Sequence, residues 1–190
     1  RETFLALEKY VALISKWTKA INLVGKSTET DIWRRHIEDS LQLVSLIPPV
    51  STLADMGSGG GLPGLVIAIT RPEIAVTLIE QDQRKAAFLQ ECIAQLKLTN
   101  TRVINADINT VTEPFEMITA RALAPLSDLC ALAYPRLQKG ATCLFPKGQN
   151  FAKELEEAQQ YWTFKHQYIP SKTDEKAAII QIAGLSPKGT

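Results

Sequence analysis

A glycine-rich stretch that follows a short apolar segment constrains the fold of this chain more than any other feature. Residues 51–70 read Ser-Thr-Leu-Ala-Asp-Met-Gly-Ser-Gly-Gly-Gly-Leu-Pro-Gly-Leu-Val-Ile-Ala-Ile-Thr. Gly57, Gly59 and Gly61 occupy alternate positions after Asp55, and glycine permits positive φ and close approach of the backbone to a ligand. The pattern predicts a buried strand, a ligand-binding turn and the beginning of a helix.

The spacing of these glycines favours one class of nucleotide site over another. The dinucleotide fingerprint G-x-G-x-x-G is not met, because Leu62 stands in place of its third glycine. The series Asp55-x-Gly57-x-Gly59-x-Gly61 resembles instead motif I of the S-adenosylmethionine-dependent methyltransferases with a Rossmann-like sheet. This resemblance implies that Asp55 and the three glycines belong to a site for S-adenosylmethionine.

A second marker is Glu80, which follows the apolar run 75–79. An acidic residue about 20 positions beyond the glycines can accept hydrogen bonds from ribose hydroxyls. The alternative is a turn rich in glycine and a glutamate that simply faces solvent. Two signals at the expected separation favour the nucleoside site.

Strands and helices are expected to alternate beyond the glycine loop. Strands are predicted at 75–79, 102–105, 115–119 and 141–145, and helices at 84–97, 126–134 and 151–161. Two last apolar runs, 162–169 and 177–182, are joined by seven residues, which suits only an antiparallel pair. The predicted fold class is α/β: a Rossmann-like methyltransferase with a mostly parallel seven-stranded sheet that ends in an antiparallel hairpin.

Residues 1–50 are predicted to form a helical cap that belongs to the same compact unit as the methyltransferase domain, residues 51–190. Amphipathic patterns predict helices at 3–21 and 31–45. The second contains the polar run Arg34–Ser40, which is either a solvated face or a face that closes over the cofactor cleft with its arginines toward phosphate.

Composition limits the remaining function classes. The chain has 190 residues, of which 45% are hydrophobic, and this suits one compact domain. No apolar run approaches the roughly 20 residues that span a bilayer. The three cysteines are far apart and there are only two histidines, so we expect buried thiols in the reducing cytoplasm and no metal cofactor.

The net charge is only +1, but the charges are unevenly distributed. Basic and acidic residues number 7 and 6 in residues 1–50, 5 and 8 in residues 51–120, and 9 and 6 in residues 121–190. A polyanion such as RNA should therefore meet a local basic patch in the C-terminal part.

Ligands of an open parallel sheet collect beyond the carboxyl ends of its strands. This rule adds Asp107, Ile108 and Asn109 after the third strand. Asp107 and Asn109 either form hydrogen bonds with adenine or serve ordinary turn chemistry, and Ile108 offers its backbone N–H and an apolar contact.

The same rule nominates Arg121 after the fourth strand and Lys147 after the fifth. Arg121 lies in an apolar strand end, where an unpaired guanidinium is costly to bury. It therefore needs an anion, which is a protein carboxylate, the carboxylate of the cofactor or an RNA phosphate. Lys147 is either a substrate contact or an exposed turn lysine.

The methyl acceptor is limited by what each reaction requires. Enzymes for exocyclic amines commonly carry Asn-Pro-Pro-Tyr or Asp-Pro-Pro-Tyr after strand four, where this chain reads Ala-Arg-Ala-Leu. Pyrimidine C5 needs a cysteine nucleophile, typically after proline, and the chain contains no Pro-Cys pair. Guanine N7 carries a lone pair and no proton, so alignment suffices and no general base is expected.

Taken together, the motifs resemble those of one family, ribosomal RNA small subunit methyltransferase G, also called glucose-inhibited division protein B. They are the run Tyr10 to Leu23, Arg35-His36-Ile37-x-Asp39-Ser40-Leu41, the glycine loop through Gly64, Arg84-Lys85-x-x-Phe88-Leu89, Ala120-Arg121-Ala122 and Lys147-Gly148-Gln149. The resemblance implies methyl transfer from S-adenosylmethionine to N7 of a guanine in bacterial 16S rRNA, in the free rRNA or the small ribosomal subunit. Implied cofactor contacts are Gly57, Leu62, Ile108, Asn109 and Arg121, although Asn109 stands where an acidic residue is common.

Two other interpretations stay open at the level of sequence. The chain is a methyltransferase of another acceptor, or a non-catalytic RNA-binding or assembly protein on this scaffold. For the rRNA enzyme, the candidates for positioning the substrate are His36, Arg121 and Lys147, and we expect a monomer.

Overall fold

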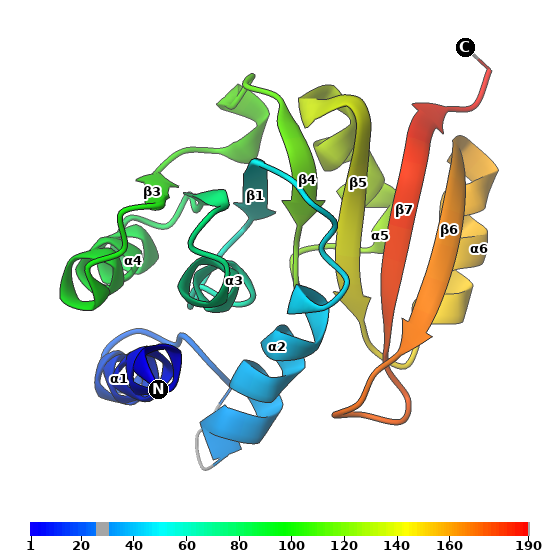
Figure 1. Cartoon of the computed structure of the whole chain (residues 1–190). Coiled ribbons are helices and arrows are strands. Elements are labelled where there is room, and N and C mark those ends of the chain that lie inside the picture. The colour runs from blue at the N-terminus through cyan, green and yellow to red at the C-terminus, as the bar shows by residue number, and fades with distance from the viewer. Residues whose placement is uncertain (26–30, 190) are drawn as a thin grey trace.

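The fold is organised around one mixed sheet of seven strands (Figure 1). The computed structural model describes residues 1–25 and 31–189. In spatial order the strands are β3 (Thr101–Ile104), β2 (Ala75–Ile79), β1 (Thr52–Met56), β4 (Phe115–Thr119), β5 (Leu137–Lys147), β7 (Ala178–Pro187) and β6 (Trp162–Pro170). The predicted fold class is confirmed.

Six strands run in the same direction, and β7 alone runs opposite to them. β1 pairs in parallel with both β2 and β4, whereas β7 is antiparallel to β5 and to β6. The chain leaves β1 toward β2 and β3 on one side and returns to β4 and β5 on the other. The strand order therefore reverses between β1 and β4, which is where ligands of such sheets bind.

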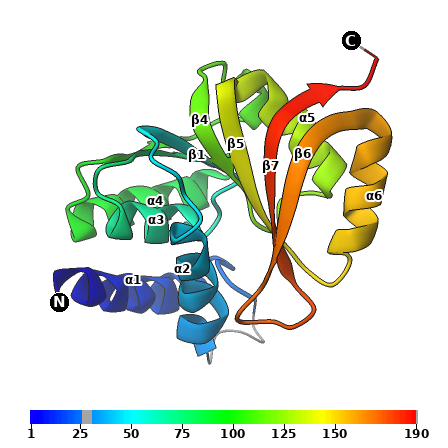
Figure 2. The ribbon, with the colours of Figure 1, turned by 45° about the vertical axis from the view of Figure 1, so that its right-hand side comes forward.

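Helices cover both faces of the sheet (Figure 2). One apolar core lies under α1 (Glu2–Thr18), α2 (Asp39–Val44), α3 (Gly64–Thr70) and α4 (Gln83–Leu96). A second core lies under α5 (Leu126–Ala133) and α6 (Phe151–Tyr161). Short 3-10 turns at Ile108–Thr110 and Tyr134–Arg136 complete the described elements.

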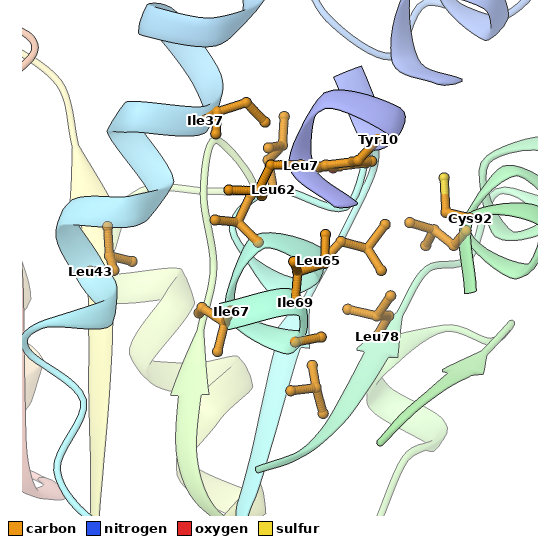
Figure 3. Packing of buried hydrophobic residues seen from close by; sticks show 14 of the residues in the cluster. Leu7, Tyr10, Ile37, Leu43, Leu62, Leu65, Ile67, Ile69, Leu78 and Cys92 are labelled. Atoms are coloured by element: carbon orange, nitrogen blue, oxygen red, sulfur yellow. The ribbon is translucent and has the colours of Figure 1, made fainter. Parts of the chain in front are cut away.

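Helix α3 is the element that the first core surrounds (Figure 3). Leu65 and Ile67 are fully buried, as are Leu78 of β2 and Tyr10 of α1. The apolar sequence of α3 is thus explained by contacts on several sides, since a helix that is apolar all round is buried. Because α3 directly follows the glycine loop, this packing also fixes the position of the loop.

Most predicted boundaries are within a few residues of the observed ones. The first helix ends at Thr18 rather than at residue 21, and β5 begins at Leu137 rather than at 141. The second helix was expected to be regular, but its segment Trp33–Glu38 is a π-helix that precedes α2. The three cysteines are buried thiols, as predicted. None of the described helices is long and apolar enough to span a membrane.

Candidate active site

The glycine loop, residues 57–63, connects β1 to α3 at the carboxyl edge of the sheet. Gly57, Gly59 and Gly61 have φ values of +64°, +56° and +86°, a region that side chains disfavour. The hydroxyl of the buried Tyr10 donates to the carbonyl of Gly60 at 2.5 Å. Helix α1 therefore braces the loop from outside the sheet.

Asp55 lies at the end of β1, buried under the glycine loop, and does not line the cavity described below. Its carboxylate accepts from the Thr119 hydroxyl at 2.7 Å and from the Gly64 backbone N–H at 3.3 Å. The side chain is fully buried, and burial raises its pKa to about 6 although the hydrogen bond from Thr119 opposes this. Asp55 thus connects β1 to β4 and to the first turn of α3.

Glu80 braces the loop from the end of β2. Its Oε2 accepts from the Gly59 backbone N–H at 2.7 Å, and its Oε1 accepts from the Asp82 N–H at 2.8 Å. The residue is 7% exposed and lines a cavity above the loop. A carboxylate oxygen has two lone pairs, so both oxygens keep acceptor capacity toward that cavity.

The first cavity has a volume of about 360 Å³, which is within the range of small-molecule sites. Six of the ten residues predicted to contact the cofactor line it, namely Gly57, Gly59, Leu62, Glu80, Ile108 and Arg121. Asp55, Gly61, Asp107 and Asn109 are not among its walls. Gly61 is part of the loop itself, and Asp55 supports the loop through Gly64 and Thr119.

Asp107 and Asn109 form a turn, which was the alternative to adenine contact. Asp107 Oδ1 accepts from the backbone N–H of Asn109 at 2.8 Å and from its side-chain Nδ2 at 3.0 Å. This capping places Ile108 against the first cavity while the two polar side chains bond to each other. The adenine contact expected of Asp107 and Asn109 therefore stays a prediction, and the structure shows their role in the turn.

Arg121 lies where the first cavity meets a second one. Its guanidinium forms an ion pair with Asp39 at 3.1 Å and a hydrogen bond with Nδ1 of His36 at 3.1 Å. Because a guanidinium only donates, Nδ1 of His36 must accept, which requires a neutral ring protonated at Nε2. Burial, and next the charge of Arg121, lower the pKa of His36 to about 4. The anion that Arg121 needs is thus supplied in part by the protein itself.

The polar run Arg34–Ser40 is divided between two roles. Arg35, His36 and Asp39 line the second cavity, whereas the Ser40 hydroxyl is buried and donates to the His36 carbonyl at 2.7 Å. The π-helical segment sets this arrangement, since π-helical turns re-aim side chains and are frequent at functional sites. The run is therefore neither wholly solvated nor wholly directed at a ligand.

The second cavity has a volume of about 460 Å³ and lies between α2, the end of β5 and the β6–β7 turn. Lys147, the last residue of β5, lines it and is paired with Glu154 of α6 at 2.6 Å. Its ammonium also donates to the Ala124 carbonyl at 2.9 Å, so Lys147 is not an exposed turn lysine. The three candidates for positioning the substrate, His36, Arg121 and Lys147, all line this cavity.

Several wall residues were not predicted. The first cavity is also lined by Leu23, Ser58, Gly60, Ile79, Gln81, Lys85, Ala106, Ala122 and Leu123. Leu23, Lys85 and Ala122 stand in the motifs that carry the family resemblance, and that was the signal available for them. Asp39 stands in one of these motifs too, but only the structure reveals its contact with Arg121.

Comparisons with known proteins agree with this geometry. The family model of GidB, rRNA small subunit methyltransferase G, matches residues 4–180. A ribosomal RNA small subunit methyltransferase G of Methylorubrum extorquens is 46% identical, covering 98% of this chain and 90% of the relative. That of Acidiphilium cryptum is 50% identical, covering 94% and 84%.

Solved structures show the same fold at low sequence identity. A putative S-adenosyl-L-methionine-dependent methyltransferase of Methanococcus maripaludis superimposes with a TM-score of 0.65 at 11% identity, covering 95% of this chain and 94% of that one. An S-adenosylmethionine-dependent methyltransferase of Aquifex aeolicus gives 0.62 at 12% identity, covering 84% and 95%. The sequence matches, which are far stronger, decide the family: this chain belongs to the rRNA small subunit methyltransferase G family.

Proposed function

We propose that this protein transfers the methyl group of S-adenosylmethionine to N7 of a guanine in bacterial 16S rRNA. The observation that carries the proposal is the family match over nearly the whole chain, in a protein whose two cavities meet at Arg121. The first cavity holds the methyl donor and the second holds the acceptor nucleotide.

The residues of the first cavity suit the methyl donor by their chemistry. Glu80 offers a carboxylate to the two ribose hydroxyls, while Leu62 and Ile108 offer apolar contacts to a purine ring. The positive charge of Arg121 suits the carboxylate of the methionine part. When bound, S-adenosylmethionine supplies an electrophilic methyl group, and the loop orients that group toward the second cavity.

The side chains around the junction suit an acceptor that needs no deprotonation. His36 is neutral near pH 7, and its Nδ1 is occupied by Arg121. Burial raises the pKa of Cys92 and of Cys130 to about 12, so neither offers the thiolate that methylation of a pyrimidine carbon needs. Guanine N7 attacks through its own lone pair, and the protein contributes alignment and exclusion of water.

The proposed organisation follows from the same arrangement. Residues 1–50 act as a cap that braces the loop through Tyr10 and reaches Arg121 through His36 and Asp39. Residues 51–190 form the methyltransferase domain. We further propose that the protein works as a monomer in the bacterial cytoplasm, with rRNA or the small ribosomal subunit as its partner.

Incubation with methyl-labelled S-adenosylmethionine and small-subunit rRNA, or small subunits from cells lacking this protein, tests the proposal. We expect label at N7 of one guanine, removed by ribonuclease. Label that resists ribonuclease identifies another acceptor. No label, together with no cofactor binding in calorimetry, identifies a non-catalytic RNA-binding protein.

A further inference from the structure

The second cavity is lined by a fixed pair of unlike charges as well as by Arg121. Lys147 and Glu154 both line the cavity. Their side chains are only 9% and 21% exposed, and Nζ lies 2.6 Å from Oε2. The two cavities share Leu23, Arg121 and Ala122, so a base placed against the pair lies beside the proposed methyl donor.

The hydrogen bonds of this pair leave one donor and one acceptor in reserve. Nζ of Lys147 donates to the Ala124 carbonyl at 2.9 Å and forms an ion pair with Glu154, which leaves at least one of its three hydrogens available. Oε2 of Glu154 accepts from the Leu126 backbone N–H at 2.8 Å and is the oxygen that faces Nζ of Lys147 in the ion pair. Within residues 1–25 and 31–189, Oε1 of Glu154 accepts no hydrogen bond. Side by side, the pair presents one N–H and one free carboxylate oxygen.

This order of donor and acceptor matches guanine and opposes adenine. Guanine presents the O6 acceptor next to the N1–H donor, whereas adenine presents the N6 amino donor next to the N1 acceptor. We propose that the Lys147–Glu154 pair selects guanine, with Nζ donating to O6 and Oε1 accepting from N1–H. This inference rests on the proposed function, because it assumes that the second cavity receives the acceptor base.

The same placement orients the reacting atom. N7 neighbours O6 on the major-groove edge of guanine, so a base held at O6 and N1 leaves N7 without a hydrogen bond to the pair and open to the methyl group. The methyl group would reach N7 from the first cavity, which shares Leu23, Arg121 and Ala122 with the second. One pair of side chains would therefore provide both base selection and alignment. A mismatched base leaves a half-buried donor and acceptor unpaired, and we expect a preference of about tenfold to a hundredfold.

Nucleotide binding to the protein saturated with S-adenosylhomocysteine tests this directly and needs no turnover. The probes are the 5′-monophosphates of guanosine, inosine, adenosine and 2-aminopurine riboside, titrated by NMR. Inosine keeps O6 and N1–H but lacks the 2-amino group, whereas 2-aminopurine lacks both O6 and N1–H. We expect the guanosine and inosine nucleotides to bind at least about tenfold more tightly than the other two.

The variant Glu154→Gln keeps an oxygen for the Leu126 N–H but places an amide nitrogen at Oε1. It should lose the preference while its affinity for S-adenosylhomocysteine, measured by calorimetry, stays unchanged. Lys147→Met removes the donor to O6 and should also abolish the preference for the guanosine and inosine nucleotides. Glu157→Gln, on the same helix in an exposed pair with Lys153, should keep it.

The inference is overturned if the native protein binds the four nucleotides equally, if guanosine monophosphate shows no saturable binding, or if Glu154→Gln retains the preference. These outcomes are separate from the fate of the proposed function. If the protein labelled a guanine in rRNA but bound the four nucleotides equally, the proposed function would stand and the inference about Lys147 and Glu154 would be wrong.

Discussion

The two cavities of this protein are built in different ways. The first is formed largely by consecutive backbone at strand ends, with the glycine loop braced by Glu80 and Tyr10. The second is formed by side chains from segments that are distant in sequence. Asp39 alone accepts from Arg121, from Gln42 and from Thr173 of the β6–β7 turn.

The shape of the first cavity is set by the backbone, whereas the shape of the second depends on individual side chains. A backbone cradle tolerates few changes, because each one moves the chain itself, and it suits a ligand that many enzymes share. A cavity of paired side chains can change one partner without moving a strand, and it suits recognition of a particular acceptor. We therefore expect substitutions in the first region to affect folding and donor binding, and substitutions in the second to affect acceptor recognition.

Gly61→Ala should have the largest effect. A Cβ at Gly61 would lie 2.5 Å from Leu65 Cδ1 and 2.9 Å from the Tyr10 hydroxyl, and both side chains are fully buried. We expect a loss of about 4 kcal/mol in the free energy of unfolding, from left-handed strain plus overpacking. Donor affinity should fall about a hundredfold because the loop is displaced. Denaturant unfolding and calorimetry measure the two effects.

Gly140→Ala is the matched control for this change. Gly140 has a φ of +83°, close to the +86° of Gly61, but an added Cβ would meet nothing within 4 Å. It should cost only the backbone strain, about 1 kcal/mol. Equal losses in the two variants would refute the claim that crowding holds the loop in place.

The two regions should respond to pH with opposite signs. Burial raises the pKa of Asp55 to about 6 from an ordinary 3.8, so the folded state binds a proton that the unfolded state has released. Its stability contribution is fully present below about pH 4 and is lost as pH rises through about 6, by about 3 kcal/mol. Asp55→Asn should remove this slope.

His36 should show the reverse dependence. Its pKa is lowered to about 4 from an ordinary 6.5, so the unfolded state gains a proton first as pH falls. The stability contribution is present above about pH 6.5 and is lost as pH falls through about 4. Unfolding free energies of the native protein, Asp55→Asn and His36→Gln between about pH 4 and 8 measure both. If Asp55 and His36 contributed pH slopes of the same sign to the free energy of unfolding, the environments described for their side chains would be wrong.

Glu80→Gln should weaken binding of the donor without affecting the acceptor. Hydrogen bonds to a charged group contribute about 1.5–3 kcal/mol, so we expect a loss of about thirtyfold in affinity for S-adenosylhomocysteine and no change in affinity for rRNA. Asp82→Asn is the control, because Asp82 caps α4 through the Arg84 and Lys85 N–H groups and is not in the cavity wall. A similar loss in both variants would point to general disturbance of the loop.

Asp39→Asn should have the smallest effect on stability, about 1 kcal/mol, because the ion pair with Arg121 is half-buried. Its main effect should be on the acceptor side, as a higher KM for rRNA with donor affinity changed less than in Glu80→Gln. Glu38→Gln, an exposed neighbour, should change neither. If Asp39→Asn weakened the donor more than the acceptor, the division between the cavities would be wrong.

Local sequence signals predicted the fold and the first cavity better than the second. The loop glycines and the seven-residue connection before β7 act within a few residues of the chain, and Glu80 lies at a fixed spacing of 21 positions from Gly59; all three agree with the observed arrangement. For Asp107 and Asn109 the sequence left two roles open, because capping a turn and binding a base require the same polar side chains, and the structure shows the turn contacts. The contact of Arg121 with Asp39 joins residues that are 82 positions apart, which no local pattern specifies. Glu154 is only seven positions after Lys147, but their contact depends on how the chain turns between β5 and α6.

The structure of the protein with S-adenosylhomocysteine bound tests the central claim most directly. We predict that the ligand occupies the first cavity, with its ribose hydroxyls on the carboxylate of Glu80 and its sulfur directed toward Arg121 and the second cavity. A ligand in the second cavity, or one whose ribose makes no contact with Glu80, would contradict that claim.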